Sequence, residues 1–260
     1  MGETNSMTKA DEIYWAEGKE LTYTDKSSGL KFYRTWCEYL GFEAWLSPGW
    51  ISHSLLPFGL YERPVFEALR LYLRPGDTFA DIGANIGLMS IFAHKITGGP
   101  IFAVEPEDRM RYLLKKNFYL AGIDEEAICS LAAGRVSAVG EITLSTLPAM
   151  TSLVRNFDDK HIKQAVQIEP IDNILPWVPR ALKIDVEGYD LEALAGASST
   201  LASMGKGSFV IVEPHPGLGA DAATVGEVLR GAGFAVHNLA GDGSLIPIAH
   251  RDGQVIGFKL

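Results

Sequence analysis

Residues 79–95 constrain the fold of this chain more than any other segment. An apolar run leads into four residues at alternate positions, Asp81, Gly83, Asn85 and Gly87, and apolar residues at helical spacing follow. The pattern predicts a buried strand that turns through glycines into a helix. A unit of strand, glycine turn and helix is typical of α/β folds that bind a nucleoside cofactor at the turn.

The residues of the turn indicate which cofactor it binds. Dinucleotide folds have the spacing Gly-x-Gly-x-x-Gly and hold a charged pyrophosphate with bare glycines and a helix N-terminus. A carboxylate at Asp81 and a side chain at Asn85 would be badly placed against a pyrophosphate. They suit S-adenosylmethionine, which carries an ammonium and a sulfonium and no phosphate. The turn therefore favours S-adenosylmethionine over a nicotinamide dinucleotide.

A second acid follows at the spacing that ribose binding requires. The apolar run Pro100–Pro106 contains Glu105 about 20 residues beyond the glycine turn, where such folds hold a ribose diol. A carboxylate can accept two hydroxyl hydrogen bonds, and Pro106 ends the strand so that the acid lies at its carboxyl edge. The alternative for either acid taken alone is a turn residue or a helix cap.

Four further side chains follow two later strands. Asp185 and Glu187 lie at the end of a buried strand, and Glu213 and His215 end the next one. Because ligands bind at the carboxyl ends of strands in α/β sheets, we expect the four to converge above the sheet. His215 is the candidate base for taking a hydroxyl proton. Asp185 or Glu213 would orient the imidazole or accept the proton; the alternative for His215 is a loop residue satisfied by backbone.

The same four side chains raise the question of a metal. Carboxylates and imidazole suit Mg, Mn or Zn, but no spacing here resembles a dedicated metal motif, so a divalent cation is not favoured. Asp190 and Glu192 have a simpler interpretation, because the first turn of a helix favours acids.

From about Arg63 onward, strands and helices alternate, which predicts a sheet with helices on both faces. The last segment, Gly253–Leu260, is expected to be an edge strand paired with its neighbour across Gly241–Gly243. The other expected elements are strands near 127–133, 141–145, 166–171, 181–186, 209–213 and 235–239, and helices near 63–73, 107–122, 190–203 and 222–232.

The first 58 residues differ from the rest, so we expect two parts, residues 1–58 and 59–260. Residues 1 to about 28 are polar and predict a loose arm or a short helix begun by Asp11. Aromatic residues crowd residues 30–62. They either seal one end of the sheet or form the wall of an acceptor pocket.

Composition excludes several classes of protein. The chain has 260 residues, 47% hydrophobic and 21% charged, with no apolar stretch near the length of a membrane span and no apolar leader. We therefore expect a soluble, cytoplasmic protein. The net charge of −9 argues against a nucleic-acid substrate. Cys37 and Cys129 lie far apart and are expected to act as small buried hydrophobes.

Through an ordered set of motifs, the sequence resembles the FkbM family of S-adenosylmethionine-dependent methyltransferases from about Gly59 to the C-terminus. A single motif would support this resemblance only weakly, but the whole set in this order is specific to the family. The motifs are Gly59–Glu62, Leu73–Asp77, Asp81–Gly87, Val104–Pro106, Asn117, Thr151–Leu153, Ile171–Asp172, Lys183–Gly188, Gly196–Ala197 and Val212–His215.

The resemblance implies a class I methyltransferase (Rossmann-like) fold: a seven-stranded sheet, mostly parallel, with an antiparallel last strand. It also implies O-methylation of a hydroxyl on a sugar, glycolipid or secondary metabolite. Adenine would lie near Leu131 to Ala133. The implied cofactor contacts are Asp81, Gly83, Asn85, Glu105 and Asp185, with Tyr61, Ala84 and Ser152 as weaker candidates.

The expected partners are a small-molecule or glycan acceptor and a second copy of the chain in a homodimer. The N-terminal arm would either cover the site or reach a partner subunit. Two other functions stay open. A nicotinamide oxidoreductase would need the glycine spacing that the turn lacks. A binding or scaffold domain would keep the fold without the chemistry, although Asp81, Gly83, Glu105 and Asp185 are all in place.

Overall fold

The computed structural model describes residues 13–16, 20–24, 31–47, 59–144, 162–218, 220–248 and 253–260. The chain divides into two compact units, Met1–Tyr61 and Glu62–Leu260. Among the described residues, none of the helices combines the length and the apolar character needed to cross a bilayer.

The N-terminal unit is an antiparallel sheet. Its strands have the order β1-β2-β3-β4, with bounds β1 (Ile13–Ala16), β2 (Glu20–Thr24), β3 (Lys31–Cys37) and β4 (Phe42–Leu46). The expectation of a loose arm or a helix over the first residues is therefore wrong for residues 13–16 and 20–24, while Asp11 lies outside the described residues. Aromatic and β-branched side chains favour strands because they pack well on a pleated surface.

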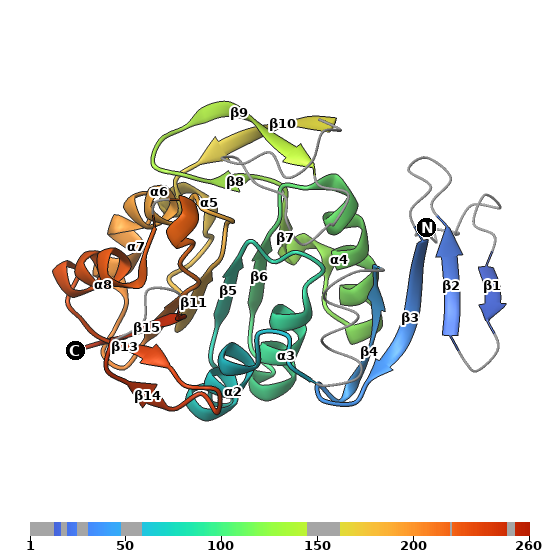
Figure 1. The fold of residues 1–260 in the computed structure, drawn as a ribbon, viewed down its shortest axis with the longest axis horizontal. Coiled ribbons are helices and arrows are strands. Elements are labelled where there is room, and N and C mark those ends of the chain that lie inside the picture. The colour runs from blue at the N-terminus through green and yellow to red at the C-terminus, as the bar shows by residue number, and fades with distance from the viewer. Residues whose placement is uncertain are drawn as a thin grey trace. The chain divides into compact units, whose positions relative to one another are not determined.

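The second unit is built on one large sheet (Figure 1). Its strand order is β14-β13-β15-β12-β11-β5-β6-β7, and the run from β12 to β7 is parallel. The seven expected strands are present, and the two-residue β14 adds one at the edge. The bounds are β5 (Phe79–Ile82), β6 (Ile101–Val104), β7 (Ile128–Cys129), β11 (Ala181–Ile184), β12 (Phe209–Val212), β13 (Phe234–Leu239), β14 (Leu245–Ile246) and β15 (Val255–Lys259).

The last strand is antiparallel, as expected, but it is not at an edge. β15 lies between β12 and β13 and pairs with both. Val255 and Ile256 are fully buried there, so their apolar side chains are covered on both faces of the sheet. The hairpin across Gly241–Gly243 joins β13 to β14 instead.

Helices cover both faces of this sheet (Figure 1). On one face, residues of α5 to α8 form a single buried cluster with alternate residues of β5, β11 and β12. On the other, Phe66 of α2 meets Phe92 of α3 edge-on, and Tyr72 packs on Phe209 and Phe258. The helices are α2 (Arg63–Tyr72), α3 (Leu88–Thr97), α4 (Asp108–Ala121), α5 (Ile171–Ile174), α6 (Asp190–Ala195), α7 (Ser198–Ser203) and α8 (Ala222–Gly231), with 3-10 turns η1 (Glu125–Ala127) and η3 (Pro216–Leu218).

The helix expected over residues 190–203 is broken in two at Gly196. A Cβ on Gly196 would lie 2.0 Å from the carbonyl oxygen of Gly134, so only glycine fits this close approach. The carboxylate of Asp172 then accepts hydrogen bonds from the backbone N–H groups of Ser199 (2.9 Å) and Thr200 (2.7 Å). This tertiary contact supplies the acceptors that begin α7.

The strand expected near residues 127–133 is also divided. β7 stays in the large sheet, whereas β8 (Ala132–Ala133) pairs with β10 (Ile162–Glu169). β10 also pairs with β9 (Ala138–Leu144), which makes a separate three-stranded sheet in the order β8-β10-β9.

The order of the large sheet locates the site. From β5 the chain moves outward through β6 and β7, and then returns to place β11 on the other side of β5. The carboxyl ends of β5 and β11 therefore border a topological switch point, where open α/β sheets bind ligands.

Candidate active site

The glycine turn after β5 brings the backbone close to neighbouring elements. Gly83 has φ +79°, and a Cβ there would lie 1.7 Å from the carbonyl oxygen of Asp185. Gly87 has φ +83°, and its Cβ would lie 2.2 Å from the side chain of Leu114. Both positions therefore favour glycine for conformation, and at Gly83 the neighbouring backbone also leaves no room for a Cβ. Asn117 of α4 fixes the turn by donating to the carbonyl oxygen of Ile86 at 2.8 Å.

The turn does not offer all of its backbone N–H groups to a ligand. The N–H groups of Gly83 and Ala84 both donate to the carbonyl oxygen of Val104, at 2.9 and 3.0 Å. Side chains are therefore left to contact a ligand at this point. The Oδ1 atom of Asn85 is buried and has no hydrogen-bond partner among the described residues.

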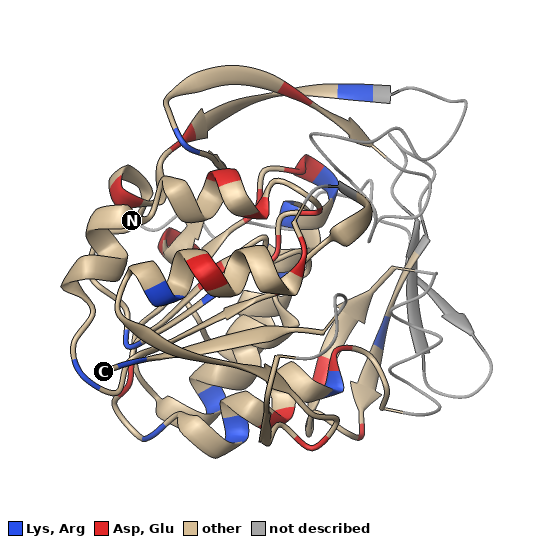
Figure 2. Ribbon diagram, turned by 60° about the vertical axis from the view of Figure 1, so that its left-hand side comes forward, with Lys and Arg blue, Asp and Glu red and all other residues tan. Residues whose placement is uncertain are grey.

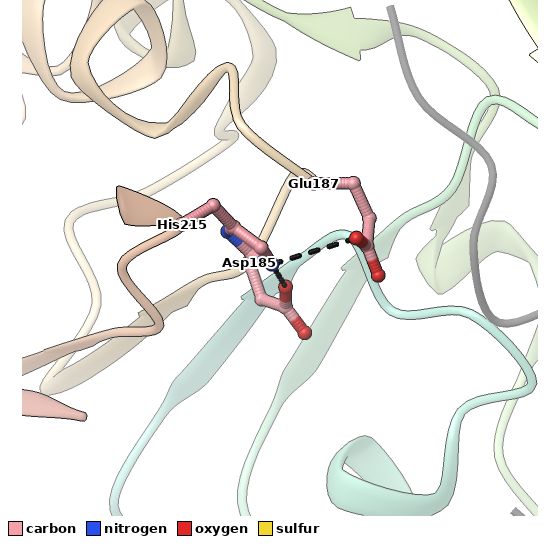
Figure 3. A group of neighbouring side chains, drawn as sticks. All are labelled: Asp185, Glu187 and His215. Carbon is pink, nitrogen blue, oxygen red and sulfur yellow. Dashed lines mark ion pairs between the residues drawn. The ribbon is translucent and has the colours of Figure 1, made fainter. Parts of the chain in front are cut away.

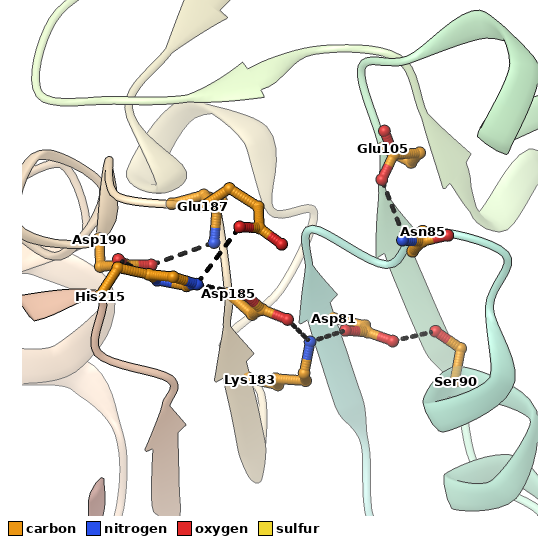
Figure 4. Close-up of polar contacts among 10 residues, drawn as sticks. Asp81, Asn85, Ser90, Glu105, Lys183, Asp185, Glu187, Asp190 and His215 are labelled. Atoms are coloured by element: carbon orange, nitrogen blue, oxygen red, sulfur yellow. Dashed lines mark hydrogen bonds and ion pairs between the residues drawn. The ribbon is translucent and has the colours of Figure 1, made fainter. Parts of the chain in front are cut away.

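Asp81 lies beneath the turn in a line of polar contacts (Figure 4). Its carboxylate is fully buried, accepts a 2.7 Å hydrogen bond from Ser90, and lies 3.8 Å from the ammonium of Lys183. Lys183 in turn donates to Asp185 at 3.0 Å. Burial raises the pKa of Asp81, and the positive charge of Lys183 opposes that shift.

Lys183 is the buried cation that balances these acids. Its side chain is 4% exposed. Burial alone would lower its pKa, but the negative charges of Asp185, Glu62, Asp81 and Glu213 together raise that pKa well above its usual range. Lys183 therefore stays charged and links the glycine turn to the end of β11.

Glu105 lies at the carboxyl end of β6, as expected. Its two carboxylate oxygens accept hydrogen bonds from the backbone N–H groups of Asn85 (2.8 Å) and Glu107 (2.7 Å). Burial raises its pKa to about 7, although these two bonds favour the ionised form. Each oxygen keeps a further lone pair, which a ligand hydroxyl can use.

A pocket opens beside these residues. It encloses about 640 Å³ of space, part of which is open to solvent. Its lining combines polar groups with apolar side chains, among them Met110, Leu131 and Ile142. The full lining is Ile82, Gly83, Asn85, Val104, Glu105, Pro106, Glu107, Met110, Leu131, Ala132, Ala133, Ile142, Asp185, Val186 and Glu187.

Asp185, Glu187 and His215 converge at the carboxyl ends of β11 and β12 (Figure 3). The Nε2 atom of His215 lies 3.5 Å from Glu187 Oε2 and 3.8 Å from Asp185 Oδ1. Burial and the negative charge of Asp185 raise the pKa of Glu187 to about 8. Burial lowers the pKa of His215, but the hydrogen bond that its ring makes to Asp190 and the charges of the surrounding carboxylates raise it to about 9.

Asp190 is a residue that sequence reasoning missed. Its carboxylate is fully buried, lies 2.9 Å from Nδ1 of His215, and accepts a 3.0 Å hydrogen bond from the backbone N–H of Val186. An acid in the first turn of a helix has a sufficient local explanation, so no local pattern separates Asp190 from Glu192, which instead pairs with Arg135.

Glu213 is the fourth residue of the expected group, and its carboxylate lies near those of Asp185 and Glu62. Burial and the charges of Glu62 and Asp185 raise its pKa well above the usual range. Among the described residues, two trios bring three donor atoms within 4.8 Å, namely Asp185 with Glu187 and His215, and Asp185 with Glu62 and Glu213. This spacing would accept one cation, but acidic groups often adopt it without an ion.

The loops at this end of the strands are rich in acids (Figure 2). Of the expected cofactor contacts, Gly83, Asn85, Glu105 and Asp185 line the pocket, whereas Asp81 and Ala84 do not. Two more cannot be placed relative to it. Tyr61 is the last residue of the N-terminal unit, and Ser152 lies outside the described residues, so both stay predictions.

The geometry can be compared with known proteins. The sequence profile of the methyltransferase FkbM domain matches residues 81–236, which is more than half of the chain. The chain belongs to the FkbM methyltransferase family. This is a family of S-adenosylmethionine-dependent methyltransferases, and the large sheet of this chain has the class I Rossmann-like order.

Individual relatives are more distant. The hexuronic acid methyltransferase AglP of Haloferax volcanii is 29% identical over 161 residues, which are 60% of this chain and 64% of AglP. The chain thus spans less than two thirds of that relative.

Solved structures are also distant. A methyltransferase FkbM from Methylobacillus flagellatus has a TM-score of 0.47 at 16% identity, covering 72% of this chain and 44% of that one. A putative rRNA-methylase from Clostridium thermocellum has a TM-score of 0.48 at 12% identity, covering 75% of this chain and 92% of that one.

The pocket fits S-adenosylmethionine in its polar groups. The carboxylate of Glu105 can accept from a ribose diol, and the buried oxygen of Asn85 can accept from an ammonium. The apolar side chains in the lining suit an adenine ring. The acids at Asp185 and Glu187, which line the same pocket, would attract a sulfonium.

Proposed function

We propose that this FkbM methyltransferase transfers a methyl group to a hydroxyl of a sugar or another small hydroxylated molecule. The relative AglP is a hexuronic acid methyltransferase, which supports an acceptor of sugar type. The catalytic part is assigned to residues 59–260. Substrate choice is assigned to the aromatic-rich N-terminal segment.

In this proposal Asp81, Gly83, Asn85 and Glu105 hold the cofactor, with Tyr61, Ala84 and Ser152 as weaker contacts. Asp185 lies at the junction of the cofactor and acceptor sites. The acceptor lies beside Glu187, Glu213 and His215.

One observation carries the assignment of the acceptor side. Asp185 and Glu187 line the pocket, and the Nε2 atom of His215 lies between them, within 3.8 Å of both carboxylates. A hydroxyl placed here would have a proton acceptor within reach.

The chemistry is an in-line displacement. Bound S-adenosylmethionine supplies a methyl group on a positively charged sulfur. The acceptor oxygen forms the new O–C bond as the S–C bond breaks, and the sulfur keeps that electron pair and becomes a neutral thioether. His215 takes the hydroxyl proton on Nε2. The protein contributes positioning as well as this base.

The test is an assay with methyl-labelled S-adenosylmethionine and paired acceptors, such as glucose and glucuronic acid. We expect a methyl ether that survives mild alkali. A product that alkali hydrolyses would be an ester, and it would move the methyl group from a hydroxyl to a carboxyl. Transfer to neither class, with the cofactor bound, would favour a scaffold role.

His215→Ala tests the base in the same assay. We expect kcat to fall about a hundredfold or more, while calorimetry shows unchanged affinity for S-adenosylmethionine. Full activity in this variant would move the base to a carboxylate.

A further inference from the structure

We propose that Asp190 is a positioning residue for methyl transfer, which holds His215 in the one tautomer and ring orientation that leaves Nε2 free to accept a proton from the acceptor. This inference rests on the proposed function and extends it to a residue outside the expected site.

Asp190 is held rigidly from two sides. Oδ1 accepts a 3.0 Å hydrogen bond from the backbone N–H of Val186, and Oδ2 lies 2.9 Å from Nδ1 of His215 (Figure 4). The carboxylate is fully buried. Its orientation is therefore set by the loop that follows β11, the same loop that carries Asp185 and Glu187.

The contact determines which ring nitrogen carries a proton. A carboxylate offers acceptors only, so the Nδ1 that faces Asp190 must be the donor. When His215 is neutral, Nε2 is then the unprotonated nitrogen. Nε2 is also the atom that faces Glu187 and Asp185. A buried acid behind an imidazole is a known way to select the basic tautomer.

Charged groups reach His215 from three elements. Asp190 comes from α6, Asp185 and Glu187 from the loop after β11, and Glu213 from the end of β12. All are acids, and together they hold a proton on His215 at neutral pH. Methyl transfer should therefore speed up as pH rises toward 9, because His215 must lose its Nε2 proton before it can accept another.

Asp190→Asn is the decisive variant. The asparagine Oδ1 can still accept from Val186, but its NH₂ would face Nδ1 and force that nitrogen to become an acceptor. The Nε2 atom would then carry the proton. We expect kcat to fall about a hundredfold or more, with KM and cofactor affinity unchanged.

Two readouts separate this role from a structural one. The pKa of His215, measured by NMR titration of the imidazole, should be lower in Asp190→Asn, because the carboxylate favours the charged ring. The pH midpoint of kcat should move down with it. In a His215→Ala background, Asp190→Asn should cause no further loss, because Asp190 acts through that ring.

Glu192→Gln is the matched control. It removes an acid from the same helix, but Glu192 pairs with Arg135 at the surface, so kcat and the His215 pKa should not change. Thermal unfolding of each variant shows whether it is folded.

Several results would overturn the inference. Wild-type kcat in Asp190→Asn, an unchanged His215 pKa, or an additive loss in the double variant would each do so. Loss of activity in EDTA with rescue by Mg²⁺ or Mn²⁺ would make His215 a ligand rather than a base. If the wild type methylates no hydroxyl, the proposed function fails. The shift of the His215 pKa in Asp190→Asn would still be seen by NMR, so the two failures can be told apart.

Discussion

Replacing Glu105 by glutamine should weaken binding of S-adenosylmethionine and remove part of its pH dependence. Each carboxylate oxygen already accepts a backbone N–H, from Asn85 at 2.8 Å and from Glu107 at 2.7 Å. A glutamine NH₂ in place of either oxygen would face one of these donors and could not accept a ribose hydroxyl. At least one bond of the ribose diol would be lost.

The magnitude follows from the charge of the acceptor. A hydrogen bond to a charged group contributes about 1.5–3 kcal/mol, so the dissociation constant at pH 8 should rise roughly tenfold to a hundredfold. Burial raises the pKa of Glu105 to about 7. Ribose hydroxyls donate more strongly to the ionised form than to the protonated one, so affinity should fall as pH drops below that value, by up to about tenfold between pH 8 and pH 6.

Isothermal calorimetry from pH 6 to pH 8 measures both effects. The ammonium of the ligand also titrates near this range, so the Glu105→Gln series supplies the correction, and the difference between the two series isolates Glu105. Glu125→Gln is the control, since the Glu125 side chain is 62% exposed. Wild-type affinity in Glu105→Gln, or identical pH profiles for the two proteins, would refute the ribose assignment.

Two further changes test the fold around the site. Gly83→Ala places a Cβ 1.7 Å from the backbone oxygen of Asp185 at φ +79°, and should lower the free energy of unfolding by more than about 2 kcal/mol, roughly the sum of strain and overpacking. The control Gly98→Ala, with φ +59° and nothing within 4 Å, should cost only about 1 kcal/mol. Equal losses of the two variants in urea unfolding would contradict the close approach at Gly83. Lys183→Met leaves the buried carboxylate of Asp81 and the partly buried one of Asp185 without their cation, and should cost about 3–5 kcal/mol. Lys163→Met, on an exposed pair, should cost less than about 1 kcal/mol. A small effect at Lys183 would show that water or protons replace its charge.

Several long-range features had no signal in the sequence. The expected single helix over residues 190–203 breaks because Gly196 packs on the backbone of Gly134, a contact between residues far apart in the chain. The last strand looked like an edge because its own pattern shows only that it is apolar. Its place between β12 and β13 depends on which strands it pairs with in the folded sheet.

The sequence by itself determined the features that depend on local spacing. Alternating glycines after an apolar run specify a turn from strand to helix, and Glu105 lies at the end of the next strand because Pro106 stops it. The placement of Asp185, Glu187, Glu213 and His215 at strand ends was also readable, since parallel strands present their carboxyl ends at the same edge.

Only the tertiary structure decided which of these groups touch. Parallel pairing of β11 with β12 brings His215 to Asp190, across 25 residues of chain, and pairing of β11 with β5 sets Lys183 directly beside Asp81. An acid in a first helical turn and a lysine in a strand carry no local mark of burial. Their charges acquire a role only when neighbouring strands remove the water that would otherwise screen them.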